Sequence, residues 1–117
     1  MNPPTIHFGV AEHWVERAVV VAVWGDLDLA TAPKLSDAIE AAAQKDPTAL
    51  IVDLSRVDFL ASAGMTVLIS AHRDLAPSAR FGVIADGPST SRPLRLIGMD
   101  RIVDVYRTLD DALDEFA

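Results

Sequence analysis

The chain has 117 residues, of which 50% are hydrophobic and 23% charged, which fits one globular domain and argues against intrinsic disorder. Its formal net charge of −7 and its ten scattered Lys and Arg residues argue against binding to nucleic acid or to an anionic membrane surface. The absence of cysteine excludes disulfides, thiolate metal clusters and cysteine nucleophiles.

Strand-like runs alternate with helical patterns from the start of the chain. Residues 5–10 predict an edge strand. Residues 18–24 form a continuous apolar, largely β-branched run that ends at Gly25, which is typical of a strand covered on both faces. A helix is predicted to begin at Thr31, its N-cap, and to end before Pro47.

The middle of the chain repeats this alternation. Residues 49–54 predict a second apolar strand, and apolar spacing over residues 65–72 predicts the next helix. Residues 80–85 predict a third strand. A short helix is expected to follow, capped by Ser89 or Ser91.

The C-terminal part predicts a short edge strand at residues 103–106 and a last helix capped by Thr108. The buried face of that helix is expected to hold Leu109, Ala112, Leu113 and Phe116. Because parallel crossovers are right-handed, these elements predict an α/β fold with a mixed sheet and helices packed mainly on it.

Residues 1–117 show no linker, internal repeat or low-complexity tract, so we expect a single domain with its core at about residues 14–116. No apolar run reaches the roughly 18 residues that a membrane span needs. The polar start of the chain lacks the basic and apolar regions of a signal peptide. We therefore expect a cytoplasmic protein that does not enter a membrane.

Two connections are candidate sites, because ligands of open α/β sheets gather outside the carboxyl ends of the strands. They are residues 25–31 and residues 54–65, and the second connection contains the predicted turn at residues 58–65. The second is unusual because Val57, Phe59 and Leu60 are apolar where a turn should be polar. Val57 and Phe59 are each expected to tuck under the sheet, and the exposed remainder would form a modest docking patch.

Ser62 lies where the second predicted helix begins. Its hydroxyl is in position to cap the free backbone N–H groups, and a phosphate there would meet the same donors and the helix dipole. As a plain cap, Ser62 needs no function. Gly64 in the first helical turn costs up to about 1 kcal/mol relative to alanine, which indicates close approach by another backbone or by a partner.

An alternative chemistry is suggested by Asp53 near a strand end, together with Asp26 and Asp28 in the earlier connection. Such a carboxylate cluster suits a phospho-accepting aspartate with magnesium, as in response-regulator receivers. Receivers, however, pair two adjacent acids after the first strand and carry a lysine at a later strand end. Here the third strand is followed by Asp86 and Gly87, so solvated loop charges explain the aspartates adequately.

Other catalytic or cofactor patterns are missing from the sequence. His7, His13 and His72 are far apart and show no metal-ligand spacing. No Ser-His-Asp order stands out, and the isolated glycines form no phosphate-cradling loop. We therefore expect no metal, no cofactor and no enzymatic activity.

Two stretches resemble the signatures of STAS domains: WGDLDLATAP at residues 24–33 and VDLSRVDFLASAG at residues 52–64. The segments LIGMDRI (96–102) and YRTLDDAL (106–113) are also similar to the family, so the likeness covers nearly all of residues 14–116. The chain most resembles the bacterial anti-sigma factor antagonists. The resemblance implies a mixed four- to five-stranded sheet with about four helices packed mainly on one face.

The resemblance also implies a role in partner switching. In the family, the antagonist captures an anti-sigma factor that is also a serine kinase, and this frees a sigma factor for transcription. The kinase phosphorylates a serine directly before the glycine that opens the second helix, and phosphorylation releases the antagonist. A phosphate adds about −1.5 to −2 charges at pH 7, which is enough to oppose docking.

The chain departs from the family pattern at this position. The usual Asp-Ser-Ser-Gly or Asp-Thr-Ser-Gly stretch is replaced by Ala61, Ser62, Ala63 and Gly64, so the family's phosphoserine position is Ala63. Ser62, one residue earlier, is either a displaced acceptor or only a helix cap, and both remain open. An alanine at position 61 removes a like charge, which makes phosphorylation of Ser62 electrostatically easier.

We predict that a kinase-fold anti-sigma factor docks on residues Asp26, Asp28, Asp58, Ala61, Ser62, Ala63, Gly64 and Met65. An alternative is a STAS sensing or scaffold module that binds a nucleotide or other small ligand in a shallow cleft beside the two small alanines. The sequence leaves open whether the chain is a monomer or a weak dimer.

Overall fold

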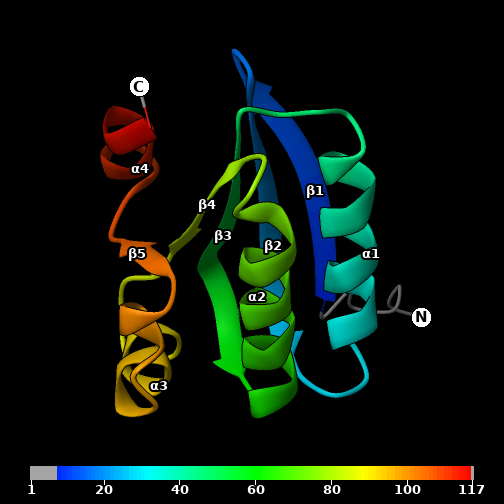
Figure 1. Cartoon of the computed structure of the whole chain (residues 1–117). Helices are drawn as coiled ribbons and strands as arrows, with labels where there is room; N and C mark the ends of the chain where they lie inside the picture. Colours follow the sequence, from blue (N-terminus) through cyan, green and yellow to red (C-terminus); the bar gives the residue numbers. More distant parts are fainter. Residues whose placement is uncertain (1–7, 117) are drawn as a thin grey trace, which may run out of the picture.

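The computed structural model describes residues 8–116, which form a five-stranded sheet in the order β1-β2-β3-β4-β5 (Figure 1). β1 runs antiparallel to β2, and the other neighbours are parallel. The predicted mixed α/β fold is therefore confirmed. The elements are β1 Phe8–Val15, β2 Ala18–Leu27, α1 Ala32–Ala43, β3 Ala49–Leu60, α2 Ser62–Leu75, β4 Arg80–Ile84, α3 Ser91–Leu96, a 3-10 turn η1 Met99–Arg101, β5 Asp104–Tyr106 and α4 Leu109–Phe116.

The first strand lies later in the chain than predicted. It was expected at residues 5–10, of which residues 5–7 lie outside the described part, and it runs from Phe8 to Val15. Glu16, with a φ of 54°, and Arg17 form the tight turn to β2. The second half of β1 is exposed and polar in places, so its sequence lacks the apolar run that marks a central strand.

β2 and β3 extend beyond the apolar runs that predicted them. β2 continues past Gly25 to Leu27, and β3 continues past Leu54 to Leu60. The two extensions pair with each other, with Leu27 opposite Leu60, after two irregularities in register. Bulges of this kind keep two strands paired while they bend away from the rest of the sheet. The first residues of the predicted turn at 58–65 are therefore strand.

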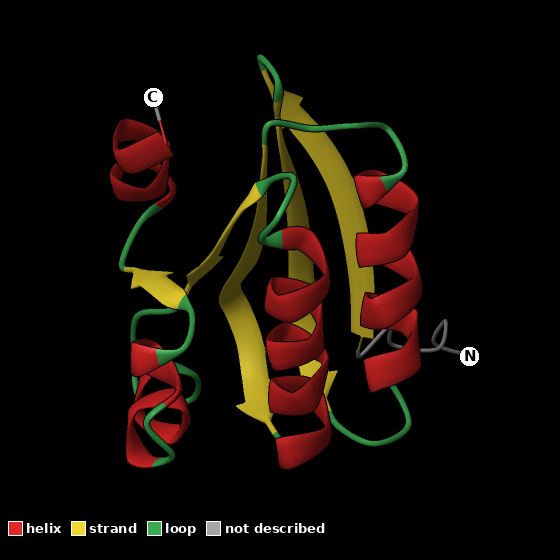
Figure 2. Ribbon diagram, viewed as in Figure 1, coloured by secondary structure: helices red, strands yellow, loops and turns green. Residues whose placement is uncertain are grey.

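The two faces of the sheet carry unequal cores, because alternate strand residues point to opposite sides. α1, α2 and α3 pack on one face, and Figure 2 shows α1 and α2 lying across it. The strand residues of that core include Val19, Val21, Val23, Leu50, Val52 and Leu54. On the other face, Val20, Ile51 and Ile84 pack against Ala112 of α4. The expectation of helices mainly on one face is confirmed.

The caps of the later helices match the predictions unevenly. Thr108 caps α4 as expected, since its hydroxyl accepts a hydrogen bond from the backbone N–H of Asp111 at 3.1 Å. At α3 the residue in the cap position is the buried Thr90, not Ser89 or Ser91, and its side chain makes no capping bond. No helix within residues 8–116 has both the length and the apolar content needed to cross a membrane.

α4 is held on the sheet by aromatic contacts. The Phe116 ring meets the edge of Tyr106 at 5.5 Å between centroids, and the Arg80 guanidinium lies 4.6 Å from the Phe116 centroid. A Cβ on Gly82 would lie 2.9 Å from Phe116, so the close approach of α4 depends on glycine in β4. The predicted buried face of this helix is confirmed, with Ala112 fully buried and its apolar neighbours partly so.

Tyr106 provides a test of this packing because it is the single tyrosine of the chain. Burial raises the pKa of its phenol above the usual range, with the Asp104 and Glu115 carboxylates adding to the rise. Since the neutral phenol is favoured in the folded state, its contribution to stability is present below the unfolded pKa and is lost as the pH rises through the folded pKa. Titration of the phenolate absorbance should give a raised pKa in the native protein and the ordinary value in denaturant. Equal values in the two states would contradict the packing.

Candidate functional site

The connections after β2 and β3 lie side by side at the carboxyl end of the sheet. Leu27 and Leu60 end the two strands and are paired, and the backbone N–H of Ala61 donates to the Leu27 carbonyl at 2.9 Å. Figure 1 shows the loop before α1 and the start of α2 at this same end. The structure therefore brings together the two stretches that carry the resemblance to STAS signatures.

Asp28 organises the first connection through its own hydrogen bonds. Its Oδ1 accepts from the backbone N–H groups of Ala30 and Thr31 at 3.0 and 3.1 Å. Thr31 stands at the N-cap position of α1 as predicted, but its hydroxyl makes no bond to a helix N–H. Instead, Thr31 Oγ1 donates to the Asp26 carbonyl at 2.8 Å and accepts from the Asp28 N–H at 2.9 Å. Asp28 is thus a half-buried residue that fixes the loop.

The second connection is shorter than the sequence indicated. Asp58, Phe59 and Leu60 are the last residues of β3, and α2 begins at Ser62, so Ala61 is the single residue between strand and helix. The predicted turn at residues 58–65 is therefore wrong, because β3 stays paired with β2 up to Leu60. The strand delivers its last side chains directly to the start of the helix.

The expected capping role of Ser62 is also wrong. The residue at the N-cap position of α2 is Ala61, whose extended backbone (φ −90°, ψ 168°) ends the strand and whose side chain cannot cap. The Ser62 side chain is exposed, and no hydrogen bond of its hydroxyl is found within residues 8–116. Ala63, the position of the family's phosphoserine, is half-buried. The serine hydroxyl is thus available at the surface rather than committed to the helix.

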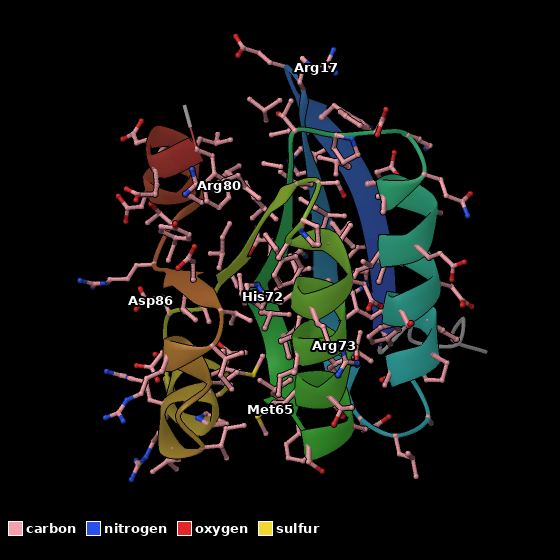
Figure 3. The ribbon with its side chains drawn as sticks, viewed as in Figure 1. Arg17, Met65, His72, Arg73, Arg80 and Asp86 are labelled. Atoms are coloured by element: carbon pink, nitrogen blue, oxygen red, sulfur yellow. The ribbon has the colours of Figure 1, made fainter. Side chains whose placement is uncertain are left out.

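Gly64 and Met65 lie on the buried side of α2 near its start. Both are buried, Met65 with 9% of its surface exposed, and Figure 3 shows Met65 at the end of α2 opposite to the end where Arg17 lies. A Cβ on Gly64 would lie 2.6 Å from Leu27 Cγ and 3.0 Å from Leu60 Cδ1. The close approach expected at Gly64 is therefore made by side chains of β2 and β3, not by another backbone.

Two large apolar side chains are exposed in these connections. Leu29 in the first connection is 81% exposed, and Phe59 at the end of β3 is 55% exposed. Phe59 was expected to tuck under the sheet together with Val57, but only Val57 is buried, at 5%. The sequence analysis missed Leu29, although a leucine between Asp28 and Ala30 in a polar loop was a signal for it. Together they form the apolar part of the site.

Asp26 and Asp58 add exposed carboxylates beside these apolar side chains. Asp26 is paired with Phe59 across the two strands, and Asp58 precedes Phe59 in β3. Within residues 8–116 neither aspartate forms an ion pair. Charged oxygens without an internal partner beside exposed apolar surface are suited to a protein interface with basic groups opposite them.

The receiver-like alternative does not fit the position of Asp53. This residue is half-buried in the middle of β3, between Ala22 and Ile84, and its Oδ1 accepts from the Ser55 N–H at 2.9 Å. The strand continues to Leu60, so Asp53 is not at the strand end where such an acceptor belongs. Within the described residues no group of three His, Asp or Glu side chains is placed to hold a metal.

The small-ligand alternative predicted a cleft beside Ala61 and Ala63. Five hollows in the described part of the chain are lined by residues other than Ala61 and Ala63. One of them, of about 570 Å³, lies beside α3 and includes Asp86, Arg92 and Arg95 in its wall. The surface at the start of α2 is better suited to docking than to enclosing a small molecule.

A family profile described as "Mlab, STAS domain" matches residues 10–104. The chain belongs to the STAS family. This STAS chain is 40% identical over 111 residues to the anti-sigma-F factor antagonist RsfB of Mycobacterium tuberculosis, which covers 95% of this chain and 89% of the relative.

Solved structures agree with this assignment. The crystal structure of an anti-sigma factor antagonist from Mycobacterium paratuberculosis superposes with a TM-score of 0.89 at 40% identity, covering 93% of each chain. The Bacillus cell fate determinant SpoIIAA in its phosphorylated form has the same fold, with a TM-score of 0.69 at 22% identity over 93% of this STAS chain and 100% of SpoIIAA. The resemblance seen in the sequence, and the fold it implied, are confirmed.

Proposed function

We propose that this STAS protein is an anti-sigma factor antagonist, which binds an anti-sigma factor of serine-kinase fold and thereby releases a sigma factor for transcription. The observation that carries the proposal is the 40% identity, over 95% of the chain, with a relative named as an anti-sigma-F factor antagonist. An anti-sigma-F factor is therefore the first candidate partner. Binding of this kind needs a surface and no catalytic group.

The geometry at the end of the sheet supports a docking role. Leu29 and Phe59 expose apolar surface, Asp26 and Asp58 add charge, and Ser62 lies at the start of the helix between them. Of the other predicted contact residues, Ala61 and Ala63 are half-buried beside Ser62, whereas Asp28, Gly64 and Met65 hold the surface in place. Rigid placement lowers the entropy that docking must overcome.

Phosphorylation of Ser62 is the regulation we propose for this surface. The serine is exposed, its hydroxyl is free of helix capping, and residue 61 is alanine, so no carboxylate precedes the acceptor. A relative of the same fold, SpoIIAA, has been solved in a phosphorylated form. A phosphate on Ser62 would place about two negative charges beside Asp26 and Asp58, which would oppose a partner surface complementary to those acids.

Calorimetric titration against the purified anti-sigma factors of the same genome tests the proposal. We expect one of them to bind, and we expect Ser62→Glu to weaken that binding about tenfold or more, equivalent to about 1.4 kcal/mol. Ser62→Ala is the matched control and should bind like the unaltered chain, because the hydroxyl makes no internal bond. If no anti-sigma factor binds, the antagonist role is wrong. If Ser62→Glu binds normally, control by phosphorylation is wrong while the antagonist role stands.

Mass spectrometry after incubation with the bound anti-sigma factor and ATP locates the acceptor. Phosphate on Ser62 of the unaltered chain supports a displaced acceptor. The variant Ala63→Ser restores a serine at the family position, and phosphate found only in that variant would mean that Ser62 is not an acceptor and that the switch is absent from the natural chain.

A further inference from the structure

A second surface, in the segment after β4, carries arginines and exposed apolar residues together. Leu96, Ile97 and Ile102 are 77%, 55% and 49% exposed. The arginines around them are also exposed, and within residues 8–116 no ion pair is found for them. We call this surface the arginine patch; it consists of Arg92, Arg95, Leu96, Ile97, Arg101 and Ile102.

The segment that carries the arginine patch is anchored in the main core. Leu94 and Met99 are fully buried and Val103 is 1% exposed, all in the main core, and they alternate along the chain with the exposed residues. Gly98, with a φ of 75°, turns the chain between α3 and η1, and the Val103 N–H donates to the Met99 carbonyl at 2.9 Å. Leu96, Ile97 and Ile102 are therefore held outward by an anchored segment.

The arginine patch lies at the same end of the molecule as the proposed docking site. Figure 1 shows α3 at the end where β3 stops and α2 starts. Of the six large hydrophobic residues exposed in the described chain, four lie in the connections after β2 and β4, Phe59 lies at the end of β3, and the exception is Trp14 in β1. Exposed apolar surface concentrated at one end of a small domain marks an interaction site.

The charge of the arginine patch differs from that of the rest of the molecule. The three arginines of the patch, counted together with Asp100 in the same segment, carry a net charge of +2 in a chain whose total is −7. The basic residues were expected to be scattered, but three of the ten lie in α3 and η1, while Arg107 follows β5 and pairs with Asp86 at 3.5 Å. This end of the molecule therefore has an acidic region around Phe59 and a basic region around Leu96.

A second copy of the chain is a poor occupant for the arginine patch. Two patches facing each other would place arginines against arginines, which is repulsive. The acidic outer face of α4, with Asp110, Asp111, Asp114 and Glu115, offers charge, but its apolar side chains are turned toward the sheet. The outer face of α4 therefore has no apolar surface with which to cover Leu96, Ile97 and Ile102. The net charge of −7 also opposes an anionic membrane.

We propose that the arginine patch is the second half of the interface with the anti-sigma factor, and that it receives an acidic segment with an apolar face on that protein. This inference rests on the proposed function and specifies the partner's chemistry. Partner carboxylates would face Arg92, Arg95 and Arg101, while apolar side chains would cover Leu96 and Ile97. The hollow of about 570 Å³ lined by Arg92, Arg95 and Leu96 gives such a segment room. Asp86 also lines this hollow, and its carboxylate is ion-paired with Arg107 at 3.5 Å.

Titration of charge-reversed variants against the anti-sigma factor that binds the unaltered chain tests this proposal. We expect Arg92→Glu, Arg95→Glu and Arg101→Glu each to weaken binding about fivefold or more, and Leu96→Ser to do likewise. The salt dependence of binding should become shallower in the arginine variants. Arg17→Glu is the matched control, because Arg17 is an exposed arginine in the β1–β2 turn at the opposite end (Figure 3). Thermal unfolding of each variant checks that it remains folded.

The outcomes separate this proposal from the one on which it rests. If the unaltered chain binds the anti-sigma factor and all four patch variants bind it equally well, the role proposed for the arginine patch is wrong and the antagonist role stands. Absence of binding by the unaltered chain overturns both. Binding of the unaltered chain to vesicles containing phosphatidylglycerol, lost in the arginine variants while the affinity for the anti-sigma factor is unchanged, would assign the patch to a membrane surface and overturn its assignment to the protein partner. Concentration-dependent self-association abolished by the same variants would overturn it in favour of a second copy.

Discussion

Replacing Phe59 with alanine is expected to weaken binding to the anti-sigma factor by about 30-fold or more, which corresponds to about 2 kcal/mol. Phe59 is 55% exposed at the end of β3, between the buried residues Val57 and Leu60 that fix the strand on either side of it. An aromatic side chain on a rigid strand end loses little conformational freedom on docking. The substitution removes mainly surface that faces solvent in the free protein.

The expected size of this effect follows from the setting of Phe59 in the site. Asp26 pairs with Phe59 across the strands and stays at the rim, where charges contribute more to the rate of association than to affinity. The aromatic ring is the largest exposed apolar group beside Ser62, so it is the residue best suited to enter a pocket of the partner. Leu29→Ala should produce a smaller loss because it removes a smaller side chain.

Trp14→Ala is the matched control for the Phe59 prediction. Trp14 is 39% exposed but pairs with Val19 near the amino end of β2, away from the site, and its Nε1 donates to Glu12 at 2.9 Å. We expect this variant to bind normally. Phe59→Ala should change the free energy of unfolding by less than about 1 kcal/mol, since half of the side chain is already exposed. Equal effects of Phe59→Ala and Trp14→Ala on affinity would contradict the proposed site.

The sequence predicted the apolar parts of the strands and the edge strand β5 well, but it missed the position of β1 and the ends of β2 and β3, for a physical reason. Residues 49–54 and 80–85 are mostly buried and are apolar except for Arg80 and the half-buried Asp53, so the starts of β3 and β4 were predicted correctly. β1 is exposed from Ala11 to Trp14 and the end of β3 carries Ser55, Arg56 and Asp58, so both mix polar and apolar residues. These strands are defined by their pairing with β2, and strand pairing cannot be read from the residues of one segment alone.

The candidate site was predicted in place but not in detail. Ser62 is a preferred capping residue type, yet it is the first residue of the helix, because the N-cap position falls on Ala61, where the extended backbone of β3 ends. The residue at Gly64 was correctly expected to meet a close neighbour, but only the fold shows that the neighbour is Leu27, 37 residues earlier in the numbering. Contacts between segments that are distant in sequence are set by the register of β2 and β3.

The arginine patch was outside the reach of the sequence analysis. Residues 96–102 resemble the family, but this resemblance and the apolar residues Leu94, Leu96 and Ile97 do not show which side chains point inward. Only the structure separates the core residues of this segment from its surface residues: Leu94 and Met99 are buried, whereas Leu96 and Ile97 are exposed. Surface charge that accumulates through folding is a property of the tertiary structure.

Leu27→Ala is expected to lower the free energy of unfolding by about 2 to 5 kcal/mol, the usual cost of emptying a fully buried leucine position. Leu27 is 0% exposed and lies under the start of α2. Gly64→Ala is expected to cost about 1 to 3 kcal/mol, because its new Cβ would lie 2.6 Å from Leu27 Cγ, too close unless one of them moves. Leu60 at 3.0 Å leaves little room on the other side.

The double variant should be less destabilised than the sum of the two single variants. Alanine at position 27 removes the Cγ and Cδ atoms that the Cβ at position 64 would meet, so the second substitution partly fills the cavity left by the first. We expect a coupling free energy of about 1 kcal/mol or more from denaturant unfolding of all four proteins. Leu50→Ala combined with Gly64→Ala is the control pair, because Leu50 is equally buried but lies near the amino end of β3, and these two effects should add.

The same four proteins test whether the two connections act as one unit in binding. Leu27 ends β2 and Gly64 lies in the first turn of α2, so their contact sets the position of Ser62 relative to Asp26. If that position matters for docking, each single variant should bind the anti-sigma factor more weakly at temperatures where it is still fully folded, and the double variant should recover part of the affinity. If the losses of stability are additive, or if every variant keeps its affinity, the site tolerates displacement of α2. The connections after β2 and β3 would then contribute to binding separately.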